Sequence, residues 1–297
     1  SRLAFLQLDE RPVPEYTVVD HIPYRPMLEV TDYPKAGDPN PAVKLGIASV
    51  SGGDPSWVDL SEYAALEFLI VNVSWTPDSR HVVHQVQDRE QTWLDLRLAD
   101  ASDGSPRRLL RETTPAWVNE NGSPTWLKDG SFLWFSERSG FKHLYRYSVA
   151  GDMLKQITTG RWEVRTFYGV DETNGVVYFS SPERSAVGTD IYRIRLDGTS
   201  MTRLSQAGGT NRALFNPDFT QYVGIWSNIT TPTQVRLHRA DGSEVRIIDA
   251  NPVPALAEFK PTPPEFVQVK TRDGFVMDGM LIKPPDFNPS RRYPIYQ

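Results

Sequence analysis

The residue types that could perform nucleophilic catalysis occur in this chain, but their spacing does not assemble them. The chain has five histidines, at positions 21, 81, 84, 143 and 238, and it has no cysteine. A nucleophile elbow needs the pentapeptide Gly-x-Ser-x-Gly at a strained strand-to-helix turn, and this pentapeptide does not occur. The lack of cysteine also excludes a cysteine nucleophile and thiolate metal sites. We therefore predict no catalytic residue within these 297 residues.

The histidines do not form a convincing metal site either. His81 and His84 are three residues apart, and on a β-strand this spacing places two side chains on opposite faces. His143 lies in a strand-like context where packing inside its own sheet is the simpler interpretation. We therefore expect no bound metal and no cofactor.

Carboxylates offer a third kind of chemistry, because paired carboxylates cleave glycosidic bonds in sialidase-like and glycosidase-like propellers. The candidates are Asp129, Asp171 and Asp218. Each occurs in a turn-forming stretch at an equivalent place in a repeat, so turn chemistry explains these residues better.

That repeat indicates the fold. The aspartates Asp78, Asp129, Asp171 and Asp218 are 51, 42 and 47 residues apart, and a four-stranded propeller blade needs about 40–50 residues. Alternating stretches such as 191–196 are typical of strands with one buried face. The sequence predicts an all-β chain of propeller blades over 1–258, with Trp75 and Trp126 as core residues. A plain β-sandwich is the alternative, but it gives no reason for the same turn to recur.

Both ends of the chain break the pattern. Residues 1–7 are similar to 79–85 but lack a preceding strand, which predicts about four and a half blades and a first blade that begins after its first strand. An insertion at 11–45 is rich in proline, so we expect 24–41 to be a rigid, extended excursion. A short helix is predicted over 60–69. Exposed edge strands would favour dimerisation or aggregation.

The last segment, 259–297, is predicted to be a linker followed by the first strands of a second domain. Prolines at 261, 263 and 264 form a stiff connection, and strands are expected at 265–270, 275–283 and 291–297. So few strands do not make a domain, so the chain is expected to be truncated there.

Charge and hydropathy exclude two other classes. The net charge is −5, and the Lys and Arg residues are scattered, which argues against a nucleic-acid partner. The chain has no apolar run of 18 residues, so no membrane span is predicted.

Several motifs occur in the order of a known family. They are Tyr33-Pro34-Lys35-Ala36-Gly37 with Asn40-Pro41, Arg89-Glu90-Gln91, Ser136-Glu137 to His143-Leu144, Gly160-Arg161-Trp162-Glu163-Val164, and Asp273-Gly274 to Tyr293-Pro294. This series resembles the dipeptidyl peptidase IV branch of the prolyl oligopeptidase (S9) family. The resemblance covers the whole chain. It implies part of an eight-bladed disc that leads into an α/β-hydrolase domain.

The resemblance also implies a function. The parent protein would be a serine exopeptidase that releases N-terminal Xaa-Pro or Xaa-Ala dipeptides, and it would be periplasmic or secreted; the residues themselves leave a cytoplasmic location open. Its Ser, Asp and His would follow residue 297, and the Glu-Glu pair that binds the substrate amine would precede Ser1, since no Glu-Glu dipeptide occurs here. Expected partners are the peptide substrate, the hydrolase domain of the same chain and, in a homodimer, a second copy. Alone, this chain is expected to be inactive.

One loop is a candidate for contact with substrate. In the family, the loop before the Trp126 strand reaches the substrate cleft, and here that loop contains Trp117, Asn119, Glu120 and Asn121. The family often places an aromatic residue and an arginine there, whereas this chain has amides and a carboxylate, so a structural loop is the alternative. A non-enzymatic, protein-binding propeller is the alternative for the whole chain, although it does not explain residues 275–295.

Overall fold

The computed structural model describes residues 1–259 and 261–296, and most of them belong to antiparallel β-sheets. The chain divides into two compact units. Unit 1 consists of Ser1–Gly140 and Leu144–Lys155, and unit 2 consists of Phe141–His143 and the residues from Gln156 onward.

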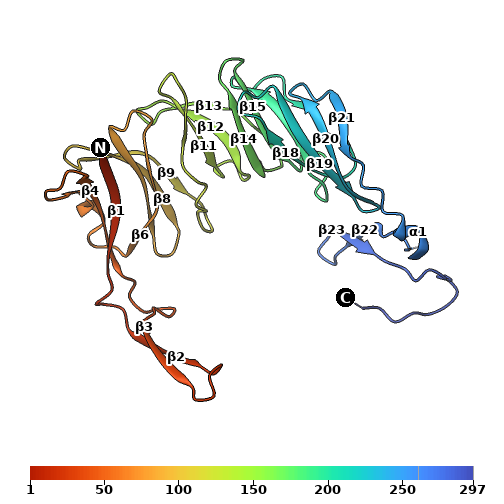
Figure 1. The fold of residues 1–297 in the computed structure, drawn as a ribbon, viewed down its shortest axis with the longest axis horizontal. Coiled ribbons are helices and arrows are strands. Elements are labelled where there is room, and N and C mark those ends of the chain that lie inside the picture. Colours follow the sequence, from red (N-terminus) through yellow and green to blue (C-terminus); the bar gives the residue numbers. More distant parts are fainter. Residues whose placement is uncertain (260, 297) are drawn as a thin grey trace. The chain divides into compact units, whose positions relative to one another are not determined.

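Four sheets share one plan: four strands in which each strand pairs with the next along the chain (Figure 1). The strands are β6 (Phe68–Trp75), β7 (His81–Asp88), β8 (Trp93–Asp100) and β9 (Pro106–Thr113); β10 (Thr125–Trp126), β11 (Phe132–Ser136), β12 (His143–Tyr147) and β13 (Met153–Gln156); β14 (Thr166–Asp171), β15 (Val176–Ser181), β16 (Asp190–Arg195) and β17 (Thr202–Arg203); and β18 (Thr210–Phe215), β19 (Gln221–Asn228), β20 (Thr231–Arg239) and β21 (Glu244–Asp249). The predicted repeat of four-stranded blades is confirmed, and the β-sandwich is not needed.

The recurring aspartates close the hairpins. Asp129 accepts hydrogen bonds from the backbone N–H of Ser131 at 2.9 Å and from its hydroxyl at 2.6 Å, while Gly130 takes a positive φ of 82°. In the β6–β7 and β18–β19 turns the corresponding left-handed residues are Ser79 (φ 58°) and Phe219 (φ 51°). A side chain at positive φ strains the backbone by about 1 kcal/mol, so packing must offset this cost. For Phe219 that packing is the stacked ring of Tyr178, 5.4 Å away.

A three-stranded sheet precedes these blades, with the order β1 (Arg2–Asp9), β4 (Ala42–Ser49), β5 (Ser56–Trp57). The insertion between β1 and β4 is not the extended excursion expected for 24–41. It contains a regular hairpin of β2 (Glu15–Asp20) and β3 (Met27–Asp32), drawn in orange-red in Figure 1. The prolines fall before β2, in the turn between the strands and after β3, where they remove no ladder hydrogen bond.

The core lies between and within the blades of each unit. In unit 1, one apolar cluster joins β7, β8 and β9 to β11 and β12, and includes Leu96, Phe132 and Tyr145. In unit 2, a cluster around Tyr178 and Tyr222 joins β15 to β19. Trp75 and Trp126 pack against the core clusters of unit 1 as partly buried side chains, as predicted.

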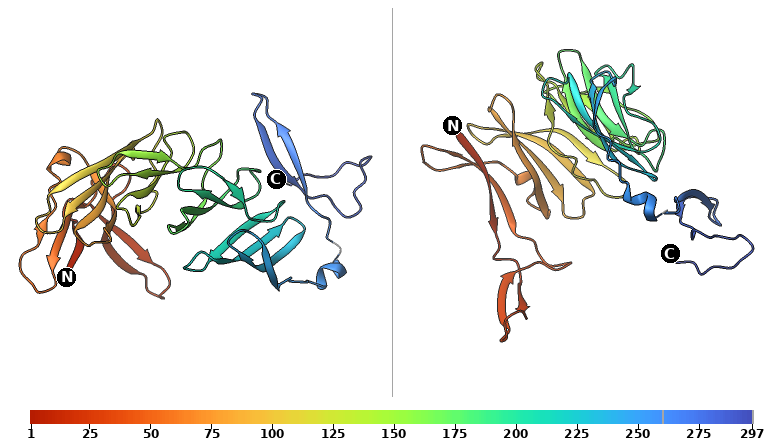
Figure 2. Two further views of the ribbon diagram at one scale, coloured as in Figure 1. Left: turned by 90° about the horizontal axis from the view of Figure 1, so that it is seen from above. Right: turned by 45° about the vertical axis from the view of Figure 1, so that its right-hand side comes forward.

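Helices are few among the described residues. One 3-10 turn, η1 (Ser61–Tyr63), and one short helix, α1 (Ala255–Phe259), are present; Figure 2 shows α1 as a single blue coil. The helix predicted over 60–69 is reduced to the 3-10 turn η1, and β6 already begins at Phe68. In the described part of the chain, no helix is long and apolar enough to cross a membrane.

The final segment forms the hairpin of β22 (Glu265–Lys270) and β23 (Val276–Leu281). The predicted third strand at 291–297 is wrong for residues 291–296, which adopt no strand, and Gln297 lies outside the described residues. A turn at Asn288 precedes residues 291–296. The backbone N–H of Asn288 donates a hydrogen bond of 2.9 Å to the Tyr293 hydroxyl. The assignment of 259–297 to a second domain stays a prediction.

Candidate functional site

The loop between β9 and β10 is attached to its blade through a buried residue, and the residue before that one is exposed. Val118 is buried, its N–H donates to the Gln91 carbonyl at 2.7 Å, and its carbonyl accepts from Gln87 Nε2 at 2.6 Å. Trp117, the residue before it, is 61% exposed. Anchoring Val118 inward therefore directs the neighbouring indole outward.

A second attachment shapes the loop at its far end. The Glu120 carboxylate accepts hydrogen bonds from the Gly122 backbone N–H at 2.8 Å and from Asn72 Nδ2 at 3.3 Å. The Gly122 carbonyl accepts from Gln85 Nε2 at 2.9 Å, and Gly122 has a positive φ of 84°. Both Gln85 and Gln87 project from one face of β7, so two buried glutamines of a central strand position the loop.

The predicted residues Asn119 and Asn121 lie together, and they lie beside a residue that sequence reasoning did not include. Asn119 Nδ2 is 3.2 Å from both carboxylate oxygens of Glu137, and Asn121 Nδ2 donates to the Asn119 carbonyl at 3.3 Å. Glu137 occurs in the Ser-Glu motif that the sequence already singled out, and that motif was the available signal. The loop presents amides, carboxylates and an indole, and none of these groups is an activated nucleophile for acyl transfer.

The histidines have structural environments. His143 is buried, with Nδ1 3.0 Å from Thr158 Oγ1 and Nε2 3.1 Å from the Gly160 carbonyl, and burial lowers the pKa of its imidazole. His84 is fully buried in β7, where burial lowers its pKa to about 4. His143 packs within its blade, as predicted. Among residues 1–259 and 261–296, no group of three or more His, Asp or Glu side chains is placed to hold a metal ion.

Two of the three aspartates considered for glycosidase-like chemistry accept hydrogen bonds within their own turns, and in the turn of the third, Asp218, Asn216 Oδ1 accepts from the Thr220 and Gln221 backbone N–H groups instead. Hydrogen bonds from Ser131 lower the pKa of Asp129, and Asp171 accepts from the Asn174 backbone N–H at 3.0 Å and from its side chain at 2.6 Å. Asp218 is an exposed residue of the β18–β19 turn. A carboxylate committed to a backbone turn is poorly placed to act as nucleophile or general acid, so turn chemistry accounts for Asp129 and Asp171.

Sequence reasoning missed a network of charges around Asp95 in β8. The Asp95 side chain is fully buried, and it accepts hydrogen bonds from Arg111 at 2.7 and 2.6 Å and from the Tyr63 hydroxyl at 2.6 Å. Burial by itself would raise the pKa of Asp95, but these hydrogen bonds outweigh it and the pKa lies below its ordinary value. Burial and the Asp95 carboxylate raise the pKa of Tyr63 to about 12, so its hydroxyl remains a donor.

The same network fastens η1 to the blade. Arg97 contacts the Tyr63 hydroxyl and donates to Glu62 at 2.6 Å, and the Tyr63 ring stacks on Trp93 at 5.4 Å. A signal was present, because alternation along β8 places Asp95 and Arg97 on one face. The partners come from residues about 15 and 35 positions away, which alternation does not reveal. The network therefore connects η1 to strands β8 and β9.

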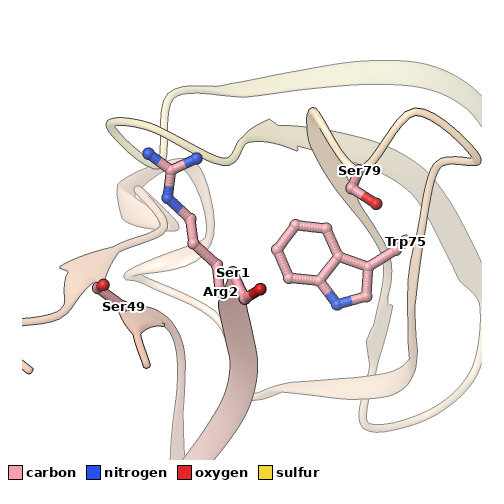
Figure 3. Close-up of a pocket in the computed structure, with 5 residues that line it drawn as sticks. All are labelled: Ser1, Arg2, Ser49, Trp75 and Ser79. Atoms are coloured by element: carbon pink, nitrogen blue, oxygen red, sulfur yellow. The ribbon is translucent and has the colours of Figure 1, made fainter. Parts of the chain in front are cut away.

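A wide hollow of about 790 Å³ opens at the start of β1 (Figure 3). It is lined by Ser1, Arg2, Ser49, Trp75 and Ser79, and Figure 3 shows the Trp75 indole projecting into it. These side chains supply hydroxyls and a guanidinium but no general base, so the hollow is no acyl-transfer site.

The chain is similar to known proteins over 99% of its length. The family model described as "Dipeptidyl peptidase IV (DPP IV) N-terminal region" matches residues 1–233. Dipeptidyl peptidase 4 of Trichophyton equinum is 24% identical over 99% of this chain, as is dipeptidyl peptidase 4 of Arthroderma otae. The crystal structure of Porphyromonas gingivalis dipeptidyl peptidase 4 superposes with a TM-score of 0.87 at 31% identity over 99% of this chain. This chain spans 40% of each of the two fungal relatives and 42% of the Porphyromonas protein.

Proposed function

The chain belongs to the family described as the dipeptidyl peptidase IV N-terminal region, and from this membership we propose that it is the propeller part of a serine-type dipeptidyl peptidase. The match of the family model over residues 1–233 carries the proposal, and the repeated four-stranded blades support it. The relatives are named dipeptidyl peptidase 4, and the chain has no Gly-x-Ser-x-Gly pentapeptide. The catalytic Ser, Asp and His would therefore belong to the remainder of the parent protein.

The test compares this chain with the complete product of its gene. The complete product is expected to hydrolyse Gly-Pro-p-nitroanilide and to be inactivated by a serine-directed organophosphate, whereas residues 1–297 alone are expected to show no hydrolysis. Hydrolysis by the chain alone would contradict the assignment. Lack of activity in a folded complete product would favour the non-enzymatic, protein-binding propeller.

Within that function, the loop at 117–121 is proposed to contact the peptide substrate. Its support is the contrast between a firmly attached backbone and an indole that is 61% exposed. A rigid loop loses little conformational entropy when it binds a ligand, and an exposed aromatic side chain supplies a large contact area. The carboxylates of Glu120 and Glu137 give this surface a negative charge suited to an uncapped or basic peptide.

The loop is tested in the complete gene product. Trp117→Ala is expected to raise KM about tenfold with little change in kcat, because the loop holds no reacting group. Leu154→Ala in β13 is the control, since Leu154 is also an exposed apolar residue (54%) but lies on an outer strand. An unchanged KM for Trp117→Ala would leave this loop a purely structural one.

We also propose that a second copy of the protein covers the β2–β3 hairpin. All residues of both strands are exposed, and Val19, Leu28 and Val30 lie on one face of the ribbon. A two-stranded ribbon is marginally stable by itself, so an apolar face of this kind favours burial against a partner. Leu28→Glu is expected to halve the mass measured by light scattering, whereas Val245→Glu on β21 is expected to leave it unchanged. A monomeric wild-type protein would contradict the proposal.

A further inference from the structure

The loop between β9 and β10 has its backbone fixed on both sides of the exposed Trp117 indole. The Trp117 carbonyl accepts a hydrogen bond from Thr114 Oγ1 at 2.9 Å. The N–H of Val118 donates to the Gln91 carbonyl at 2.7 Å, and the carbonyl of Val118 accepts from Gln87 Nε2 at 2.6 Å. These contacts fix the backbone at Trp117, so they also set the direction in which its side chain leaves the loop.

The far end of the loop is held by β7 and by its neighbour β6. Gln85 and Asn72 are directly opposite each other in the β6–β7 ladder, so their side chains lie side by side on one face of the sheet. Gln85 Nε2 donates to the Gly122 carbonyl at 2.9 Å, and Asn72 Oδ1 accepts from Ser123 Oγ at 2.7 Å. The ladder has a register shift between Ile70 and Asn72, and a bulge of this kind re-aims the side chains next to it.

The two glutamines of β7 make these bonds at a cost to stability. Both side chains are fully buried, and in each of them the second amide atom, Oε1, has no hydrogen-bond partner in the described part of the chain. A buried acceptor that has given up its bonds to water without a replacement destabilises the folded protein. An apolar residue at these positions would avoid that cost. The amides at Gln85 and Gln87 are therefore better explained by the loop that they hold than by the stability of the blade.

Glutamine also has the chemistry that these contacts require. The atoms to be bonded are the carbonyl oxygens of Val118 and Gly122, so the side chain that reaches them from β7 must be a donor. Lysine or arginine would bring a charge into a fully buried position, which costs far more than burying an amide. A glutamate of similar size donates only when it is protonated, and its carboxylate repels a carbonyl oxygen.

We propose that Gln87, together with Gln85, is a positioning residue for the binding of the peptide substrate. The two amides hold the loop in the backbone conformation that presents Trp117, so the loop is ordered before the peptide arrives. A loop that is already ordered loses less conformational entropy on binding, and this lowers KM. The inference rests on the proposed contact between loop and peptide, and it adds the buried residues of the blade that control this contact.

The experiment measures kcat and KM of the complete gene product for Gly-Pro-p-nitroanilide between pH 6 and pH 9. Burial raises the pKa of an introduced carboxyl group, so Gln87→Glu is expected to donate to the Val118 carbonyl at pH 6 and to repel it at pH 9. Its KM, relative to the wild type, is expected to rise less than about threefold at pH 6 and about tenfold at pH 9, with kcat little changed. Gln87→Leu has no titrating group, so its KM should be raised by the same factor at every pH.

Gln156→Glu is the matched control. Gln156 Nε2 also donates to a backbone carbonyl, that of Thr158 at 3.0 Å, but this contact is outside the loop. The KM of this variant is expected to equal that of the wild type at every pH. If Gln87 served stability alone, Gln87→Glu would lower the melting temperature and leave KM at the wild-type value, and the proposal would be wrong.

Further outcomes separate this inference from the proposed function. An inactive complete product would overturn both. If Trp117→Ala raises KM and Gln87→Glu does not, the loop contacts the substrate but is not positioned from β7. If neither variant raises KM, the contact between loop and peptide is wrong, and the role of Gln87 in binding is wrong with it.

Amide hydrogen exchange of the wild type tests the same inference where the variants at position 87 do not fold. The N–H groups of Val118 and Gly122 are expected to exchange more slowly than those of an unstructured peptide, both in the free protein and with a competitive inhibitor bound. Fast exchange in the free protein that slows only with the inhibitor would show that the ligand orders the loop, and this would contradict the proposal.

Discussion

Two buried tryptophans lie on the second strands of two blades, and their N–H groups have opposite environments. Trp134 in β11 is 2% exposed, and its Nε1 donates to Glu112 at 3.1 Å. The same carboxylate accepts from Ser136 at 2.7 Å and from Arg138 at 2.7 Å. Trp226 in β19 has no such acceptor, and it borders a pocket instead.

The difference shows that the second strands of two blades can place the same residue type in different polar environments. Around Trp134 the protein supplies the acceptor itself, so the polar cluster stabilises the fold. Around Trp226 no acceptor lies within hydrogen-bond distance, and Gly209 packs so closely on the indole edge that a Cβ atom there would lie 2.6 Å from Nε1. Both tryptophans follow from the same strand pattern, and only their neighbours distinguish them.

The largest expected effect comes from removing Glu112, the carboxylate that accepts the hydrogen bond from the Trp134 N–H. Glu112→Ala leaves the N–H of Trp134 and the guanidinium of Arg138 without their carboxylate, and we expect it to lower the free energy of unfolding by about 3–4 kcal/mol. Urea denaturation measures the change. Glu244→Ala is the matched control, because Glu244 also pairs with an arginine but is a partly exposed residue, and about 1 kcal/mol or less is expected. If Glu112→Ala and Glu244→Ala lowered the free energy of unfolding equally, the buried carboxylate would contribute no more to stability than the partly exposed one.

A second buried ring nitrogen without a partner, Nε2 of His84, extends the comparison to the effect of pH on stability. His84 Nε2 is buried without a partner in a strand whose residues 82–87 are all buried, and the folded-state pKa is about 4 against 6.5 for an ordinary histidine. Below pH 6.5 the unfolded chain binds a proton that the folded chain does not, so stability falls as the pH falls towards 4 and then levels off. The loss attributable to His84 is at most about 3 kcal/mol.

Urea unfolding measured between pH 4 and pH 7 tests this expectation. His84→Leu removes the titrating group, so its stability should depend less steeply on pH than that of the wild type over this interval. His21→Leu serves as the control, because His21 is exposed and its substitution is expected to leave the dependence unchanged. Parallel curves for wild type and His84→Leu would show that other groups cause the dependence.

A direct comparison of the two tryptophans gives a smaller effect. Trp134→Phe and Trp226→Phe remove similar ring volume, but only the first breaks a hydrogen bond, and that bond is to a carboxylate. We expect Trp134→Phe to be the more destabilising by about 1–2 kcal/mol. Thermal and urea unfolding of both variants measure the difference. A larger loss for Trp226→Phe would mean that its N–H has a partner.

The smallest expected effect belongs to Gly224→Ala. The added Cβ would lie 3.0 Å from His238 Cδ2, and a small movement of this side chain relieves the contact. Stability is therefore expected to change by less than about 1 kcal/mol, measured by thermal unfolding. A loss above about 3 kcal/mol would mean that His238 cannot move and that the space is tightly packed.

Local chemistry made much of the fold predictable. The Asp-containing turns and the alternation of apolar residues follow from backbone conformation and from the two faces of a strand, so the four complete blades could be predicted from the sequence. Elements whose form depends on a partner strand were placed wrongly. The β2–β3 hairpin was expected to be an extended excursion, and residues 291–296 were expected to pair with a neighbour that they do not have.

The candidate loop was predicted as a position but not as a structure. Trp117, Asn119, Glu120 and Asn121 were identified by resemblance, whereas the attachment of the loop by Gln85 and Gln87 comes from a strand about 30 residues earlier. No local pattern reports a contact across that separation.

The sequence by itself determined the class of this protein: repeated four-stranded blades, the turns between them and the absence of a nucleophile elbow. These properties depend on residue type and spacing along one strand or one turn. Only the tertiary structure decided which buried polar groups are paired. Hydrogen-bond satisfaction depends on atoms brought together from distant segments, so Glu112 satisfies the N–H of Trp134 while the N–H of Trp226 is buried without a partner.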